Sequence, residues 1–119
     1  MTELETATIT NWHAHIYYDD ESRAHAAWMR ERIDALFEVK LGRWRDEPVR
    51  PHPQAMYQVA FRPDQFAALV PWIALNRDGH VVLVHPDTGD SPADHSDHAI
   101  WLGAKLPLDI EFLRNFDSA

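Results

Sequence analysis

The chain has 119 residues, of which 45% are hydrophobic, and its formal net charge is −8 at pH 7. This composition predicts a single domain over residues 1–119 with a modest apolar core. An acidic chain lacks the basic surplus that neutralises nucleic-acid phosphates or binds an anionic membrane surface, so neither partner is expected. The chain has no cysteine, which excludes disulfides, thiol nucleophiles and thiolate metal ligands. Any bound metal would therefore have nitrogen and oxygen ligands.

We expect no secretory signal peptide at the beginning of the sequence. Residues 1–7 are polar and acidic, without the basic and apolar regions of a secretory signal. No apolar stretch approaches the roughly 18 residues that cross a membrane. We expect a cytoplasmic protein from these features.

The first predicted element is a strand over residues 9–18, where two kinds of side chain alternate. One set is expected to face a core: Trp12, Ala14, Ile16 and Tyr18. His13, His15 and Tyr17 then share the opposite face. Two imidazoles at alternate strand positions are about 7 Å apart at their Cα atoms. They can tilt toward one cation, whose bonds to histidine nitrogens measure about 2.0–2.1 Å.

A helix is predicted for residues 23–39, after the acidic and capping residues 19–22 and with Gly42 as its stop. Residues 41–46 are predicted to form a short edge strand. Three prolines exclude residues 47–53 from the interior of a sheet, because proline has no backbone N–H to donate. This segment, which contains His52, is expected to be a rigid, extended loop.

The second half of the chain repeats the pattern of strand, helix and strand before a loop-rich tail. The predicted elements are a strand at 54–61, a helix at 66–75 that is kinked or divided at Pro71, a strand at 81–85 that Pro86 stops, and a short helix near 108–116.

This order of elements predicts an α+β fold, the ferredoxin-like split βαββαβ sandwich, followed by a C-terminal extension. Its antiparallel four-stranded sheet has the spatial order 4-1-3-2, with both helices on one face. The first and last strands are antiparallel neighbours, so His85 should lie near His13. The tail, a partner subunit or a ligand must cover the other face, toward which His13 and His15 point.

The chain also carries a series of short motifs. They are His13–Tyr18, Gly42–Trp44, Pro51–Pro53, Met56–Val59, Leu69–Trp72, Leu75–Arg77, Leu83–Pro86, Thr88–Asp90, Asp94–His95, Trp101–Gly103 and Leu106–Asp109. The series covers about residues 9–113 and resembles, in order, the fungal-type DOPA 4,5-dioxygenase family and its small bacterial relatives. The resemblance implies a ferredoxin-like fold, a homodimer, and extradiol cleavage of a catechol ring by O₂ at a non-haem iron centre. Bacterial members can act on a catechol other than DOPA.

The ligands we expect are His13, His15 and His85, two from one strand and one from the end of its neighbour. Histidines on one side of a metal leave positions open for both catechol oxygens and for O₂, as in non-haem Fe(II) oxygenases. The resemblance implies Fe(II), while zinc or another divalent metal also suits an all-histidine set.

A carboxylate ligand is left open by the sequence. The candidates are Asp19, Asp20, Asp87 and Asp90. The first two also suit helix capping and the last two a turn. An all-histidine site and a water in the vacant position are the alternatives.

His52 lies between two prolines, which restrict its backbone. It is expected to act as a general acid or base in catalysis; the alternatives are a fourth ligand and a loop histidine that only packs. In the predicted topology His52 should lie closer to Tyr17 than to His13. Tyr17 is expected to line the site or to hydrogen-bond a substrate hydroxyl.

Arg43 and Arg45 flank Trp44 and are candidates for binding a substrate carboxylate, since arginine binds carboxylates through two parallel hydrogen bonds. Ordinary surface ion pairing is the alternative. His95 and His98, in the tail, could cover the open face or orient a ligand, and at least one is expected to be a solvated loop residue.

A second class of function competes with the dioxygenase. It is a non-catalytic, dimeric ferredoxin-like protein that binds a small molecule or a metal, and the unassigned carboxylate favours it. The sequence leaves open the physiological catechol and the full ligand set.

Overall fold

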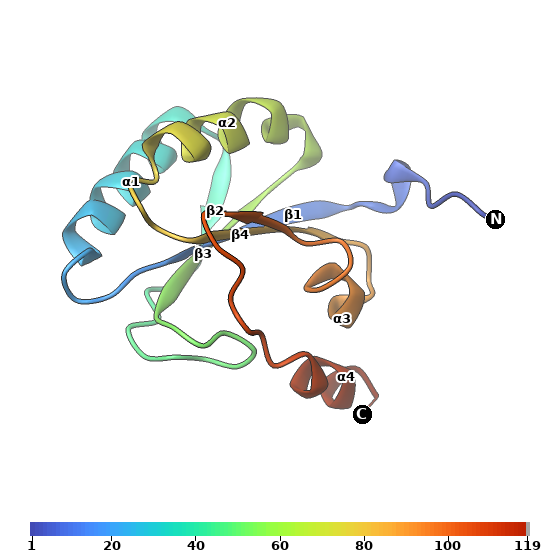
Figure 1. Cartoon of the computed structure of the whole chain (residues 1–119). Coiled ribbons are helices and arrows are strands. Elements are labelled where there is room, and N and C mark those ends of the chain that lie inside the picture. The colour runs from blue at the N-terminus through green and yellow to red at the C-terminus, as the bar shows by residue number, and fades with distance from the viewer. Residues whose placement is uncertain (119) are drawn as a thin grey trace.

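A computed structural model describes residues 1–118, with side chains through residue 116. It contains an antiparallel sheet whose five strands have the order β2-β3-β1-β4-β5. The strands are β1 (Asn11–Tyr17), β2 (Val39–Leu41), β3 (Met56–Phe61), β4 (Val82–Asp87) and β5 (Ile100–Leu102). Two helices, α1 (Arg23–Leu36) and α2 (Phe66–Asn76), cover one face of the sheet (Figure 1). The order of the first four strands and the single helical layer confirm the predicted ferredoxin-like fold.

The sheet differs from the prediction by one strand. Ile100–Leu102 returns from the tail and pairs with Val82–Val84 of β4, which extends the sheet at that edge. Three residues are too few to show the alternation by which a strand is recognised in a sequence. The expected four-stranded sheet is therefore one strand short.

The end of α1 and the start of β2 both lie closer to the N-terminus than predicted. The helix ends at Leu36 because Phe37 adopts an extended backbone, with φ −131° and ψ 154°. The partly buried Phe37 side chain packs against the core there. The strand consequently begins at Val39, and of the expected strand over residues 41–46 only Leu41 and a single bridge from Arg45 to Met56 are formed.

Pro86 does not stop β4, which continues to Asp87. The Asp87 carbonyl accepts a hydrogen bond from Thr10 N, so the nitrogen of Pro86 faces away from β1. On that side β5 has already ended, since Ile100 pairs with Val84. No ladder donor is therefore lost at the proline.

Pro71 lies inside α2, which is one helix rather than two pieces. A 3₁₀ turn, η2 (Pro63–Gln65), precedes it, and another, η1 (Thr6–Thr8), precedes β1. The tail contains α3 (Ser91–Asp94), which was not predicted, and α4 (Ile110–Ser118), which was expected two residues earlier.

The main core lies between the sheet and the two helices. The first strand and the residue after it contribute the side chains that the alternation assigns to this face: Trp12, Ala14, Ile16 and Tyr18. They pack with Met29 and Ile33 of α1 and with Leu69 and Ile73 of α2. Burial of each such large aliphatic side chain contributes about 1.5–3 kcal/mol to folding.

A smaller apolar cluster lies on the opposite face and includes Tyr17, Met56 and Leu83. The tail covers it with partly buried side chains, among them Trp101 and Leu106. The C-terminal extension thus covers part of the face that the helices leave open, as one of the three alternatives predicted. None of the helices described is long and apolar enough to span a membrane.

Candidate metal centre

The sheet register places His13 opposite His85, as the predicted topology requires. The two residues are paired across β1 and β4, and their ring centroids are 5.0 Å apart. His15 lies two residues along β1 on the same face. Its Nε2 atom lies 3.0 Å from Nε2 of His85.

The hydrogen bonds of His85 determine its tautomer. Its Nδ1 atom lies 2.9 Å from the Pro86 carbonyl, which can only accept, so Nδ1 carries the hydrogen. Burial, followed by the nearby His95, lowers the pKa of His85 to about 3. The ring is therefore neutral near pH 7 and directs the lone pair of Nε2 toward His15.

His15 is buried, with 3% of its surface exposed. Burial, reinforced by His52 and His85, lowers its pKa well below the ordinary value, so this ring is also neutral. Its Nδ1 atom is buried and has no hydrogen-bond partner among the described residues. A buried nitrogen left in this state costs about 1–3 kcal/mol, so His15 has more bonding capacity than the protein satisfies.

Two groups of histidines have nitrogens close enough to hold a metal ion. They are His13, His15 and His85, and His15, His52 and His95, with ligand atoms within 4.8 Å of one another in each group. Two nitrogens that lie about 2.1 Å from one ion, at a right angle, would be about 3.0 Å apart. The His15–His85 contact has that spacing, so the first group fits a shared cation. The three expected ligands are thus brought together.

His52 lies beside Tyr17, as predicted. Its Nδ1 atom is 2.7 Å from the Tyr17 hydroxyl, and its ring centroid is 4.3 Å from that of His15. Burial, with a smaller effect of His95, lowers the pKa of His52 to about 4. Burial also raises the pKa of Tyr17. Both side chains are consequently neutral near pH 7, and Nε2 is the nitrogen of His52 that Tyr17 leaves available.

His95 is the cluster member to which the sequence assigned no definite role. It directly follows the short helix α3, and its ring centroid lies 4.0 Å from that of His85. The Ser91 carbonyl accepts a hydrogen bond from its Nδ1 at 2.8 Å, which leaves Nε2 as the ligand atom. The only sequence signal was its place in the Asp94–His95 motif, because its position depends on how the tail folds back.

His98 lies apart from the cluster. Its Nδ1 donates to the buried carboxylate of Asp94 at 2.9 Å, which also accepts from the backbone N–H and the hydroxyl of Thr88. Burial acts to raise the pKa of Asp94, but these hydrogen bonds outweigh it and lower that pKa. Asp94 is therefore an ionised carboxylate that holds α3 against the end of β4.

Both candidate metal groups among the described residues consist only of histidines. Three of the four aspartates considered as a possible fourth ligand accept hydrogen bonds from nearby residues. Asp19 accepts hydrogen bonds from Ser22, Asp87 accepts one from Gly89 N, and Asp90 caps α3.

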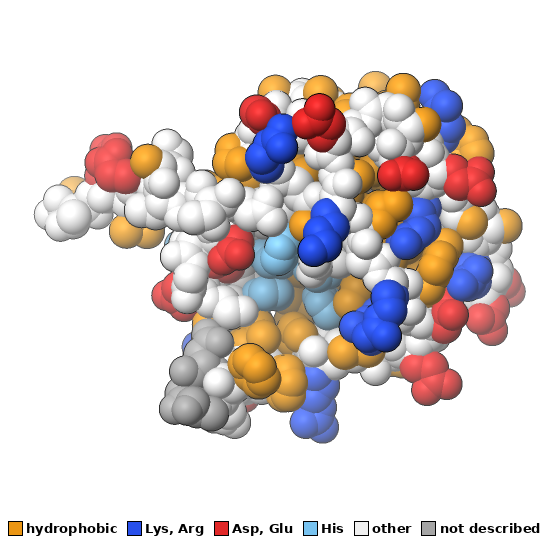
Figure 2. All heavy atoms as spheres, turned by 180° about the vertical axis from the view of Figure 1, so that it is seen from behind, with side chains coloured by type: hydrophobic (Ala, Val, Ile, Leu, Met, Phe, Trp, Pro, Cys, Tyr) orange, Lys and Arg blue, Asp and Glu red, His pale blue; other side chains and the backbone are white. Residues whose placement is uncertain are grey.

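A cleft of about 330 Å³ is lined by four of the histidines, His13, His15, His52 and His95, whereas His85 lines a neighbouring hollow. On the open face of the molecule, histidine side chains lie at the base of a hollow, with lysine and arginine side chains along one side (Figure 2). The lining residues with ionisable nitrogen atoms are His13, His15, His52, His95, Arg43, Arg45 and Arg50. Both arginines expected to bind substrate are thus on the cleft wall.

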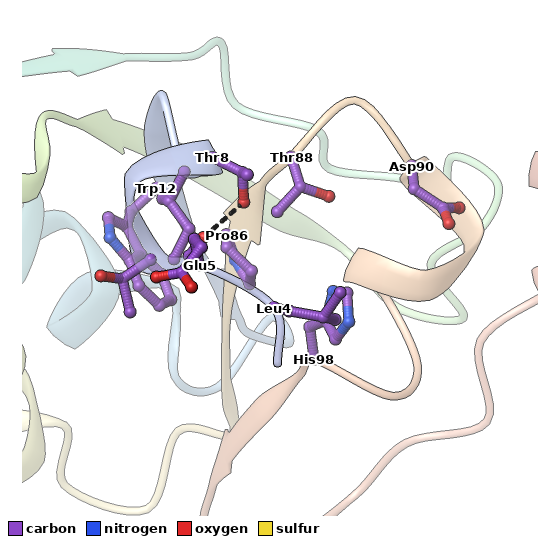
Figure 3. A pocket seen from close by; sticks show the side chains of 10 residues that line it. Leu4, Glu5, Thr8, Trp12, Pro86, Thr88, Asp90 and His98 are labelled. Carbon is purple, nitrogen blue, oxygen red and sulfur yellow. Dashed lines mark hydrogen bonds between the residues drawn. The ribbon is translucent and has the colours of Figure 1, made fainter. Parts of the chain in front are cut away.

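A second hollow, of about 440 Å³, lies between the N-terminal segment and the end of β4. The residues that line it include Leu4, Glu5, Trp12, Pro86, Asp90 and His98 (Figure 3). His98 is the only histidine among the described residues that line this hollow, so the hollow is separate from the candidate metal centre.

Comparisons with known proteins identify the family of the chain. The model of the Dopa 4,5-dioxygenase family matches residues 12–112. A crystal structure of a "putative dioxygenase" from Nostoc punctiforme is 54% identical, with a TM-score of 0.94, and the match covers 96% of this chain and 99% of that one.

Two curated fungal proteins are similar as well. A DOPA 4,5-dioxygenase from Amanita muscaria is 31% identical over 92% of this chain and 53% of its own length. An "Uncharacterized 21.2 kDa protein" from Botryotinia fuckeliana is 39% identical over 84% of this chain and 61% of its own length. The chain therefore spans only part of these relatives. Because the family match extends over most of the sequence, the chain belongs to the Dopa 4,5-dioxygenase family.

Proposed function

We propose that the protein is a metal-dependent extradiol dioxygenase that uses O₂ to cleave the ring of a catechol such as DOPA. The observation that carries the proposal is the 3.0 Å approach of two neutral imidazoles, His15 and His85, beside His13, with His13 and His15 lining a cleft. Membership of the Dopa 4,5-dioxygenase family supports the same chemistry.

His13, His15 and His85 would hold Fe(II), although zinc or another divalent ion fits three imidazoles equally well. When bound, Fe(II) would supply positive charge that favours the deprotonated catechol and a redox-active centre for O₂. The three rings contribute neutral nitrogen donors. Burial lowers the pKa of His13 as well, against the opposing effect of Asp87, so protons do not compete for these donors near pH 7.

His52 and Tyr17 would manage the proton of the catechol. The neutral His52 ring has one N–H and one lone pair, and the Tyr17 hydroxyl beside Nδ1 can either donate or accept. His52 can therefore present at Nε2 either a lone pair that takes a proton from a substrate hydroxyl or an N–H that returns it.

Arg43 and Arg45 would bind an acidic group of the substrate. Both line the cleft, and arginine forms its strongest hydrogen bonds with carboxylates.

A different ligand set remains the main alternative within this proposal. If His15, His52 and His95 held the ion, His52 would be a ligand and could not carry a proton. The unpartnered Nδ1 atom of His15 favours this arrangement, while the His15–His85 spacing favours the first.

The test begins with metal analysis of protein reconstituted with Fe(II) under anaerobic conditions. We expect one ion per chain, uptake of O₂ when a catechol is added, and a yellow ring-opened product. His15→Ala should empty the site, whereas His25→Gln, on α1 beyond the opposite face of the sheet, should not. Full metal occupancy in His15→Ala would contradict the ligand assignment, and absence of O₂ uptake would contradict the enzymatic function.

The competing function is a non-catalytic protein that binds a metal or a small molecule. The observation that favours it is the composition of the two metal groups, which contain no carboxylate among the described residues. It predicts metal retention without catechol turnover. A homodimer and a cytoplasmic location stay predictions of this proposal; sedimentation and cell fractionation test them.

A further inference from the structure

One wall of the metal cleft is strongly basic. Arg43, Arg45 and Arg50 line it together with His13, His15 and His52, and no aspartate or glutamate is among the described residues that line this cleft. Arg50 lies 3.9 Å from Asp109. The ion pairs of residues 1–116 include no partner for Arg43 or Arg45. At least two positive charges therefore face the cleft without a carboxylate of the protein.

The backbone explains why these side chains point into the cleft. Gly42 N donates to the Gln58 carbonyl at 2.7 Å, and Arg45 exchanges backbone hydrogen bonds with Met56, so this segment runs along β3. Alternate side chains of an extended segment point to opposite sides. Trp44 packs against the main core under the helices, so its neighbours Arg43 and Arg45 are directed to the histidine face.

The acidic residues lie on the other side of the histidines. Asp87 and Asp94 line a neighbouring hollow of about 150 Å³ together with His13 and His85. The ammonium and carboxylate of an amino acid are attached to one carbon atom. An amino acid whose carboxylate binds the arginines must therefore bring its ammonium group to the same basic wall.

We propose that this cleft selects a catechol acid, a catechol whose side chain ends in a carboxylate and has no ammonium group, over the corresponding amino acid. The inference rests on the proposed function, since it takes the histidine end of the cleft as the place of the ring. Arg43 and Arg45 supply charge-assisted hydrogen bonds to the carboxylate. Their charges repel an ammonium group.

The test measures binding and turnover separately. The Fe(II)-loaded protein is titrated calorimetrically without O₂, using the deaminated acid that corresponds to DOPA, the methyl ester of this acid, DOPA and dopamine. We expect the acid to bind about tenfold more tightly than its ester, the usual scale of a charge-assisted hydrogen bond. DOPA should bind more weakly than the acid, and dopamine more weakly still.

The double variant Arg43→Gln, Arg45→Gln should bind the acid and the ester equally. The matched control is Arg32→Gln, because Arg32 is an exposed residue of α1 beyond the opposite face of the sheet. It removes a positive charge from the protein but none from the cleft, and should keep the preference for the acid.

Any of four outcomes would overturn the inference. They are equal binding of acid and ester, a preference for DOPA or dopamine, a preference for the acid that survives in the double variant, and absence of binding. Turnover of the same four compounds tests the proposed function by itself. If the acid binds through the arginines but no ring is cleaved, the dioxygenase proposal fails and the anion site stands. If all four compounds are cleaved equally well, whatever the charge of the side chain, the dioxygenase proposal stands and the inferred selectivity fails.

Discussion

The hydroxyl of Tyr17 on β1 lies 2.7 Å from Nδ1 of His52, in the loop between β2 and β3. Both side chains are buried. The contact joins the proline-rich loop to the sheet beside His15 and leaves Nε2 of His52 free for the cleft. A role of His52 in proton transfer depends on this partner, because the hydroxyl can donate to Nδ1 or accept from it and so supports either tautomer of the ring.

Tyr17→Phe should lower turnover of a catechol about tenfold or more, with metal content unchanged, because His52 loses the hydroxyl that supports both of its tautomers during proton transfer. The control is Tyr57→Phe. The Tyr57 hydroxyl donates to the Ala26 carbonyl on the helical side of the sheet. Tyr57→Phe should therefore lose about as much free energy of unfolding as Tyr17→Phe, roughly 1 kcal/mol, but retain turnover. Equal turnover in the two variants would remove Tyr17 from the mechanism.

His52→Gln separates the two roles left open for His52. As a proton carrier, His52 can be replaced without loss of metal, while turnover should fall by about two orders of magnitude. Metal content from elemental analysis and kcat from O₂ uptake are the two measurements. A loss of metal that matches the loss of activity would instead assign His52 as a ligand in the group with His15 and His95.

Acid should destabilise the metal-free protein from about pH 6.5 downward. Burial lowers the pKa values of His15, His52 and His85 below the ordinary 6.5, to about 4 for His52 and about 3 for His85. The unfolded chain therefore binds protons first as the pH falls. The free energy of unfolding is then steady above pH 6.5 and decreases below it, by about 1.4 kcal/mol per pH unit for each such histidine.

Urea denaturation at a series of pH values measures this dependence. His52→Gln removes one of these groups. Between pH 6.5 and about 4, the free energy of unfolding of this variant should therefore fall less steeply with pH, by about 1.4 kcal/mol per pH unit. A free energy of unfolding that stays level through this range would show that these rings can be protonated in the fold.

Asp94→Asn should destabilise the protein by about 2 kcal/mol, because the amide cannot accept from all three donors that the carboxylate now satisfies. Asp90→Asn is the control, since its exposed side chain caps the same short helix with one longer bond of 3.3 Å, and it should cost less. Thermal denaturation of both variants checks the difference. A smaller effect of Asp94→Asn than of Asp90→Asn would be inconsistent with the proposed anchoring of α3.

The alternation of residues 9–18 was sufficient to place His13, His15 and Tyr17 on one face. The order of elements was sufficient to pair His13 with His85, because the ferredoxin-like topology makes β1 and β4 antiparallel neighbours. Pro51 and Pro53 indicated a loop around His52, but the loop is not extended as predicted, because His52 N donates to the Val49 carbonyl at 2.9 Å and closes a turn. The predictions that succeeded each depend on a local pattern or on chain topology alone.

Features that depend on the return of the tail could not be predicted in this way. Ile100–Leu102 becomes a strand only because β4 offers a free edge, and α3 brings His95 to His85 only once Asp94 is bound by Thr88. Pro86 was read as a stop because the side on which its nitrogen lies follows from strand pairing, which a single sequence does not display.

Anomalous scattering from crystals of the Fe(II)-loaded protein, collected on both sides of the iron edge, tests the central claim most directly. We predict one iron peak within about 2.1 Å of ligand nitrogens from His13, His15 and His85, open toward the cleft that Arg43 and Arg45 line. A peak elsewhere, or three rings that surround no metal in crystals of fully loaded protein, would contradict it.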